Sequence, residues 1–207
     1  MNSCDYTKAR KICFKLLHII HTHKSVYQRQ RLGEVFNNIS RASLAMGYYK
    51  QAVTYARGAQ KHVSHSITHY YSALEHEFYG LCAMKKYSHP TEITSKVFTG
   101  TYEKELGKFR CSKSNYFLAN VLFKQRQFNK TLNILSQKRE ICRDKSGWET
   151  GARILTIMTF IELNEDHKAA LAIHNLKQFF RRIDKKYPIR IRDKKILNLL
   201  SSGFEKN

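Results

Sequence analysis

The chain has 207 residues, 42% of them hydrophobic, and carries 37 Lys and Arg against 16 Asp and Glu, for a formal net charge of +21. The hydrophobic content excludes a wholly disordered chain, and no stretch approaches the roughly 18 uncharged apolar residues of a membrane span. Only two prolines occur, which favours helices over a turn-rich β-sheet architecture. The charge does not indicate a fold, but it bears on the choice of partner.

The five cysteines are scattered, odd in number and without a CxxC pair. This pattern is typical of reduced core residues rather than of a disulfide framework, so we expect a cytoplasmic protein. Charged residues and histidines interrupt the first apolar run, and no small-residue cleavage site follows it. We therefore expect no signal peptide.

The first predicted element is an amphipathic helix over residues 5–21. Its apolar side, expected to cover the following helices, consists of Cys13, Leu16, Leu17 and Ile20. The other side carries Phe14 and Ile19 among lysines and a histidine. This helix has the character of the second half of a pair, so its outer side is expected to meet a second copy, a partner or further repeats. Alternatively, the lysines suffice as a polar cap and the chain is monomeric.

Beyond a basic linker, the apolar spacing predicts successive helix pairs. A helix over residues 32–46 ends at Gly47, and the next helix places small residues where two backbones must approach closely. These residues follow Tyr49 and are Ala52, Ala56 and Ala59. Further helices are predicted over residues 70–86, about 89–106, 114–125 and 128–141.

The strongest pattern is a helical hairpin over residues 146–182. Its first stripe is Ile154, Ile157, Met158 and Ile161, and its second is Ala169, Ile173, Leu176 and Phe180. We expect Ser146 and Glu149 to form a capping box, and Asn164 to be the N-cap of the second helix. After a break at residues 185–188, Asp193 is expected to cap a short last helix, Lys194 to Leu200.

The second helices share a ring residue followed three positions later by a small residue. The pairs are Tyr49 with Ala52, Phe128 with Thr131, and His167 with Ala170. From Ala52 to Thr131 is 79 residues, about twice the 39 residues from Thr131 to Ala170. This spacing predicts a period near 39, with a further copy centred near residue 91.

The segments MGYYKQAVTYARGA and NYFLANVLFKQRQFNKTLNIL resemble tetratricopeptide (TPR) repeats, as does the hairpin over residues 148–182. The resemblance covers residues 32–183. It implies an all-α, right-handed α-solenoid of about four TPR-like hairpins with an extra N-terminal helix and a short C-terminal helix. The whole chain, 1–207, is then one domain, with residues 1–31 as helix and linker and 184–207 as a basic segment. The family implies a non-catalytic scaffold with a concave protein- or peptide-binding surface.

In such packing, the first helix of each pair lines the concave side. The outward residues expected to bind a partner are Asn37, Arg41, Leu44, His76, Tyr116, Asn120, Phe123, Thr159 and Glu162. Amides suit the backbone of an extended peptide, and rings suit its apolar side chains. The net charge favours an acidic partner. The family's clamp for a C-terminal peptide carboxylate is not reproduced.

Basic residues also cluster near both ends. The C-terminal cluster, a candidate polyanion patch, consists of Arg181, Arg182, Lys185, Lys186, Arg190, Arg192, Lys194 and Lys195. Such a cluster suits phosphates, because neutralising them releases counterions, so a nucleic-acid-associated protein is the alternative function. Aromatic residues are not interleaved as in RNA-binding motifs. A merely solvated basic surface and an anionic membrane surface also remain open.

Signals for catalysis are missing from the sequence: it has no Gly-rich phosphate loop, GxSxG or HExxH motif. We expect no enzyme and no cofactor. His62, His65 and His69 would share one face if their segment were helical, but the usual zinc spacings are absent. We therefore expect no metal site.

Overall fold

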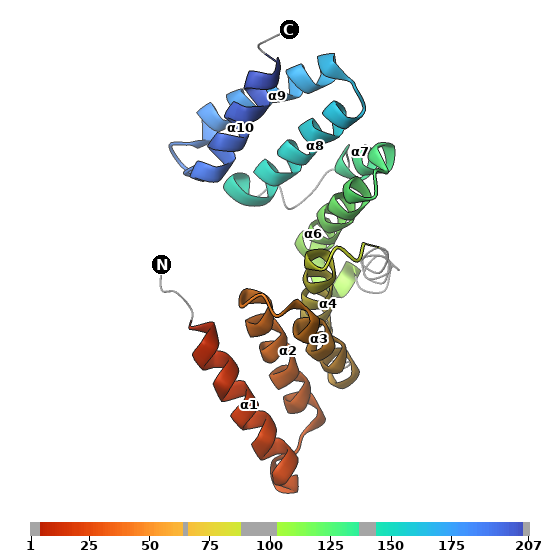
Figure 1. Cartoon of the computed structure of the whole chain (residues 1–207), viewed down its shortest axis with the longest axis vertical. Coiled ribbons are helices and arrows are strands. Elements are labelled where there is room, and N and C mark those ends of the chain that lie inside the picture. Colours follow the sequence, from red (N-terminus) through yellow and green to blue (C-terminus); the bar gives the residue numbers. More distant parts are fainter. Residues whose placement is uncertain (1–4, 64–65, 88–102, 137–143, 205–207) are drawn as a thin grey trace. The chain divides into compact units, whose positions relative to one another are not determined.

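The structure is a computed structural model that describes residues 5–63, 66–87, 103–136 and 144–204 (Figure 1). These residues form nine α-helices, a short 3-10 turn and a π-helical turn, and none of them lies in a β-strand. The prediction of an all-α fold is confirmed. The chain divides into two compact units after Leu106, and each unit is described by itself. No described helix combines the length and apolar character needed to cross a membrane.

Unit 1 contains α1 (Tyr6–Thr22), α2 (Arg29–Ala45), α3 (Tyr49–His62) and α4 (Ile67–Ala83), with a 3-10 turn at Lys24–Val26. Its helices pack in chain order, α1 on α2, α2 on α3 and α3 on α4 (Figure 1). The basic linker is shorter than predicted, because α2 already begins at Arg29. The helix predicted over residues 70–86 begins and ends three residues earlier.

The α2–α3 hairpin is closed by small residues, as predicted. Ala52, Ala56 and Ala59 of α3 are fully buried. On α2, a Cβ placed at Gly33 would overlap the Val63 side chain and lie 2.9 Å from the Cβ of His62. At Gly33 the hairpin therefore depends on the absence of a side chain.

Helix α1 is rotated relative to its predicted orientation. Ile20 is buried in a cluster with residues of α2, and the Phe14 ring meets the Tyr55 ring of α3 edge-on at a centroid distance of 5.8 Å. The predictions for Phe14 and Leu16 are therefore wrong: Phe14 faces the core and Leu16 is 38% exposed. An aromatic ring buries more surface than a leucine, and Tyr55 offers it a matching edge. Ile19 is exposed, as predicted.

Unit 2 contains most of α6 (Glu103–Lys124), then α7 (Phe128–Ser136), α8 (Thr150–Glu162), α9 (Asp166–Ile183) and α10 (Ile191–Phe204). Helix α6 bends at Gly107, whose φ is 74°, and continues where a gap was predicted. Helix α10 begins earlier than predicted, so Asp193 lies in its first turn. The helix predicted over about 89–106 lies mostly outside the described residues, as do the last five positions of the helix predicted over 128–141.

The core of unit 2 lies between α8, α9 and α10 (Figure 1). It contains Ile154, Ile157, Ile173, Leu176, Phe179, Phe180, Ile189 and Leu197. The predicted stripe of α9 is buried throughout. The stripe of α8 was predicted correctly for Ile154 and Ile157 but not for Met158, which is 36% exposed at the edge of the helix.

Four helices of the described chain, α2, α4, α6 and α8, end in the same turn. A residue in the left-handed region follows each helix: Gly47, Lys85, Arg126 and Asn164, with φ between 57° and 79°. Its N–H binds the carbonyl three residues back, and the next N–H binds the carbonyl five residues back. This is the Schellman motif. Asn164 therefore closes α8, and its prediction as the N-cap of α9 is wrong.

The start of α8 also differs from the prediction. The side chain of Asp144, not of Ser146, caps the π-helical turn Lys145–Glu149 that leads into α8, accepting hydrogen bonds from the N–H groups of Gly147 and Trp148. Glu149 is buried and pairs with Lys145 and Arg153. Its carboxylate therefore does not complete a capping box.

The four left-handed residues lie 38, 41 and 38 residues apart along the chain. Five positions after three of them stands a fully buried small residue: Ala52, Thr131 and Ala169. The predicted pairing of His167 with Ala170 is wrong by one position, because Ala170 is exposed. The position of the buried small residue is therefore fixed relative to the left-handed residue of the turn, and not relative to the ring residue that opens the helix.

Candidate functional site

The predicted concave residues of unit 1 are divided between surface and core. Arg41 is exposed, and Leu44 and His76 are half-buried. Asn37 is buried and donates a hydrogen bond from Nδ2 to the carbonyl oxygen of His69 on α4, at 3.2 Å. The expectation that Asn37 faces outward is therefore wrong, because its amide joins α2 to α4.

In unit 2, most of the predicted residues are half-buried or buried. Tyr116, Asn120 and Phe123 are half-buried on α6, and Asn120 donates to the Tyr116 carbonyl at 2.8 Å. Burial raises the pKa of the Tyr116 hydroxyl. Thr159 is fully buried and donates to the carbonyl of its own helix four residues back, so its predicted outward position is wrong. Glu162 is exposed.

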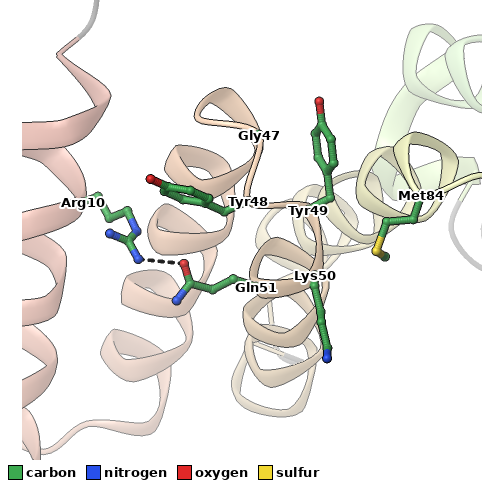
Figure 2. Close-up of a pocket in the computed structure, with 7 residues that line it drawn as sticks. All are labelled: Arg10, Gly47, Tyr48, Tyr49, Lys50, Gln51 and Met84. Atoms are coloured by element: carbon green, nitrogen blue, oxygen red, sulfur yellow. Dashed lines mark hydrogen bonds between the residues drawn. The ribbon is translucent and has the colours of Figure 1, made fainter.

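The cavity in Figure 2 lies where α1 meets the turn between α2 and α3, and it was not predicted. It has a volume of about 500 Å³ and is lined by Arg10, Gly47, Tyr48, Tyr49, Lys50, Gln51 and Met84. The side chain of Arg10 reaches toward the turn, where the Tyr48 ring lies above it and Gln51 faces it (Figure 2). Lys50 points away from Arg10, and Met84 stands on the far side at the end of α4 (Figure 2).

Neutral groups hold the guanidinium of Arg10 in place. Its Nη2 donates to Oε1 of Gln51 at 2.8 Å, and its central carbon lies 4.8 Å from the ring centroid of Phe14 and 5.2 Å from that of Tyr48. Its Nε is buried without a hydrogen-bond partner. No carboxylate in the described part of the chain pairs with it. Arg10 is therefore a cation fixed in position whose charge is not neutralised.

The start of α3 adds to the positive potential of this cavity. Tyr48 is the N-cap residue of α3, but no side chain caps the helix. The first-turn N–H groups of a helix lack intrahelical acceptors and carry the positive end of its dipole. Tyr49 and Lys50 line the cavity from this first turn. The rings of Tyr48 and Tyr49, both partly exposed, form its aromatic walls.

A local sequence signal for this site exists. Arg10, Phe14 and Leu17 stand at i, i+4 and i+7, so an arginine occupies the inward face of an amphipathic helix. Gly47 then ends α2 and turns the chain so that Tyr48 reaches Arg10 (Figure 2). The prediction did not find this site because it placed Leu16, rather than Phe14, on the buried face of α1.

All eight residues of the candidate polyanion patch are exposed. Arg192 pairs with Asp193 and Lys194 with Asp184, each at 2.8 Å. Hydrogen bonds from Lys194 and from the Ile189 N–H lower the pKa of the Asp184 carboxyl. Within the described residues, the other six cations pair with no carboxylate. They come from the end of α9, the following turn and the start of α10.

The histidines do not gather on one helix, because α3 ends at His62 and His69 lies on α4. His65 lies outside the described residues. Among the residues that the structure describes, no group of three His, Cys, Asp or Glu side chains is arranged to hold a metal ion. Burial raises the pKa of the Cys82 thiol to about 11, so this half-buried cysteine is protonated at neutral pH.

The site thus offers a fixed guanidinium, aromatic walls and an uncapped helix start, an arrangement that suits the binding of a carboxylate or another small anion. Aromatic side chains hold the cation without neutralising it.

No protein-family model matches this chain, and no curated protein matches it either.

Proposed function

We propose that this protein is a non-catalytic, TPR-like helical scaffold that binds an acidic segment of a partner protein. The observation that carries the proposal is the unneutralised Arg10 guanidinium, fixed between two rings at the rim of an open cavity. A side-chain carboxylate of the partner binds to the guanidinium there. Within the described residues, no carboxylate of the protein itself competes for Arg10.

Preorganisation makes Arg10 more effective than a freely moving surface cation. A flexible side chain loses rotamer entropy when a ligand immobilises it, and Arg10 has already lost it in the folded protein. A guanidinium forms charge-assisted, forked hydrogen bonds with a carboxylate, which a lysine ammonium does not reproduce. The uncapped start of α3 favours negative charge in the same cavity.

The scaffold part of the proposal is supported by the recurring turns. Gly47, Lys85, Arg126 and Asn164 close four helices at intervals of 38, 41 and 38 residues. Such regular spacing of identical turns is what a stack of helical hairpins requires. The net charge of +21 attracts acidic partners and speeds encounter with them.

The test uses a fluorescent, glutamate-rich peptide with glycine and serine between the acidic residues, so that it stays extended. We expect Arg10→Ala to weaken binding about tenfold or more, because a charge-assisted contact to a partly buried, preorganised guanidinium is lost. Arg10→Lys should restore only part of the affinity. The matched control is Lys130→Ala, an exposed cation on α7 in unit 2, which should change affinity less than about twofold.

Two outcomes contradict the proposal. One is binding of the Arg10→Ala protein, shown to be folded by its thermal melt, with the affinity of the unmodified chain. The other is equal binding of a peptide in which glutamine replaces every glutamate. Either result would show that this cavity does not recognise the peptide through its carboxylates.

The second candidate function is nucleic-acid binding through the C-terminal patch, favoured by its six exposed cations that pair with no described carboxylate. Generic duplex and single-stranded probes over a salt series test it. Binding that weakens steeply with salt supports this function, since released counterions drive phosphate contacts. The absence of binding at about 150 mM salt excludes it.

A further inference from the structure

An apolar stripe on α1 is left uncovered by the rest of unit 1. Ile12, Leu16 and Ile19 are 55%, 38% and 45% exposed. They stand at i, i+4 and i+7, so they lie along one side of the helix. Isolated exposed apolar residues are ordinary, but an aligned set on one helix marks an interaction surface.

A groove between α1 and α2 continues this stripe. Its volume is about 410 Å³, and it is lined by Tyr6, Ala9, Ile12 and Cys13 of α1 and by Asn38, Arg41 and Ala42 of α2. Ile12 belongs to both the stripe and the groove. The surface therefore runs along α1 and is bounded on its other side by α2.

Cations border this surface. Lys8, Lys11 and Lys15 are exposed on α1, and Arg41 is exposed on α2. None of the four has an ion pair within the described residues. The nearby carboxylates are already engaged: Asp5 caps α1, and Glu34 accepts a hydrogen bond from Gln30 and lies 3.4 Å from His69. Charge complementarity therefore calls for an acidic occupant.

A second copy of this chain is a poor occupant. Pairing α1 with α1 would bring the lysines of both copies toward one apolar seam, and like charges beside a helix contact destabilise it. The +21 charge of each chain adds long-range repulsion. An acidic amphipathic helix from another protein has neither penalty.

We propose that the α1–α2 groove docks an amphipathic helix of a partner protein, whose apolar face covers Ile12, Leu16 and Ile19 and whose flanking carboxylates pair with Lys8, Lys15 and Arg41. This is helix-in-groove recognition, with apolar anchors at helical spacing and charges at the rim. The surface is separate from the Arg10 cavity, because Arg10 faces the turn between α2 and α3 (Figure 2). It extends the proposed function by a second binding surface.

The experiment titrates the full chain with a designed peptide that carries leucines at i, i+3, i+4 and i+7 and glutamates on the flanks. Replacing Ile12 or Leu16 by Asp should weaken binding about tenfold or more. Arg41→Glu should weaken it severalfold, and more at low salt than at high salt. The matched control is Leu171→Asp on α9, since Leu171 is also 55% exposed and lies in unit 2; it should bind like the unmodified chain.

The Arg10→Ala protein separates the two proposals. It should bind this helical peptide normally while losing the extended acidic peptide, so either surface can fail without the other. A peptide of the same composition, scrambled to destroy the leucine stripe, should not bind. Equal binding of both peptides would overturn the inference.

Two further results would also overturn the inference by naming another occupant. Sedimentation could show a dimer of the chain that Leu16→Asp dissociates, which would assign the groove to a second copy. Alternatively, the chain could bind vesicles rich in anionic phosphatidylserine but not the helical peptide. If Ile12→Asp then abolished vesicle binding, the groove would be assigned to a membrane surface. Circular dichroism of each variant confirms that the helices are intact.

Discussion

The α2–α3 hairpin of unit 1 and the α8–α9 hairpin of unit 2 share the same turn but differ in the side chains that pack between their helices. In both, the first helix ends in a Schellman turn, at Gly47 or Asn164, and a buried alanine follows five positions later. Between the helices, unit 1 places Gly33 and three alanines beside the Phe36 ring, and unit 2 places isoleucine, leucine and phenylalanine.

This difference shows that the turn and the packing are specified separately. The turn needs only a residue that tolerates a positive φ and the backbone hydrogen bonds around it. The packing depends on volume: the α2–α3 contact has no room for an added methyl at Gly33, whereas the α8–α9 contact is filled by large side chains. The two hairpins should therefore respond oppositely to a change in side-chain size.

The largest effect is expected from removing volume in unit 2. Ile157→Ala should lower the free energy of unfolding by about 2–4 kcal/mol, because it leaves a cavity in a fully buried position. Met158→Ala, one position along the same helix but at its exposed edge, should cost under about 0.5 kcal/mol. Urea unfolding of both variants measures the contrast, and equal small losses would place Ile157 outside the core.

Adding volume in unit 1 should have the next largest effect. Gly33→Ala should cost about 1–3 kcal/mol, because its Cβ would overlap Val63 and crowd His62. Gly203→Ala on α10 is the matched control, since its Cβ would meet nothing within 4 Å. That control should be neutral or stabilise by up to about 1 kcal/mol through helix propensity. A neutral Gly33→Ala would mean that α2 and α3 are not in close contact.

The shared turn predicts opposite changes at two of its copies. Gly47→Ala should cost about 1 kcal/mol, because an alanine is strained at a φ of 79°. Arg126→Gly should gain up to about 1 kcal/mol, because it relieves the same strain at a φ of 60°. Thermal unfolding of the two variants checks the signs. If both variants lost stability, the Arg126 side chain would stabilise the fold by more than the strain of its positive φ costs.

The smallest expected effect is a pH dependence from His62 at the end of α3. Burial lowers the pKa of this histidine from 6.5, and the charges of Arg29 and Lys61 lower it further. The unfolded chain therefore binds the proton more readily, so stability is full above pH 6.5 and falls as the pH drops toward the folded-state pKa. His62→Gln should reduce the loss of stability between about pH 7.5 and about pH 5.5. An unchanged loss would assign the dependence to other groups.

Side-chain patterns predicted from the sequence held where one face of a helix is plainly apolar. The stripe of α9 and the alanines of α3 lie where periodicity places them, because their helices are buried along a single side. On α1 the pattern held for Cys13, Leu17 and Ile20 and failed for Leu16, because Phe14 takes its place on the buried face. Only the position of Tyr55 on α3 decides in favour of Phe14.

The helix ends and the site were harder to predict, because each depends on backbone geometry. Asn164 is an acceptable N-cap by type, and only its positive φ shows that it closes α8 instead. Arg10 belongs to an unremarkable basic segment until α1 is rotated to place it against Tyr48. Arg41, by contrast, was predicted to face a partner, and it lines the groove between α1 and α2.

The most direct test of the central claim observes the Arg10 guanidinium itself. Its Nε–H resonance can be assigned by its disappearance in the Arg10→Lys protein. We predict that the extended acidic peptide shifts this resonance and slows its hydrogen exchange, because a carboxylate binds the guanidinium in a cavity that the peptide closes. The glutamine counterpart of the peptide should leave it unmoved. An Arg10 resonance that stays in place while the acidic peptide saturates the protein would contradict the account.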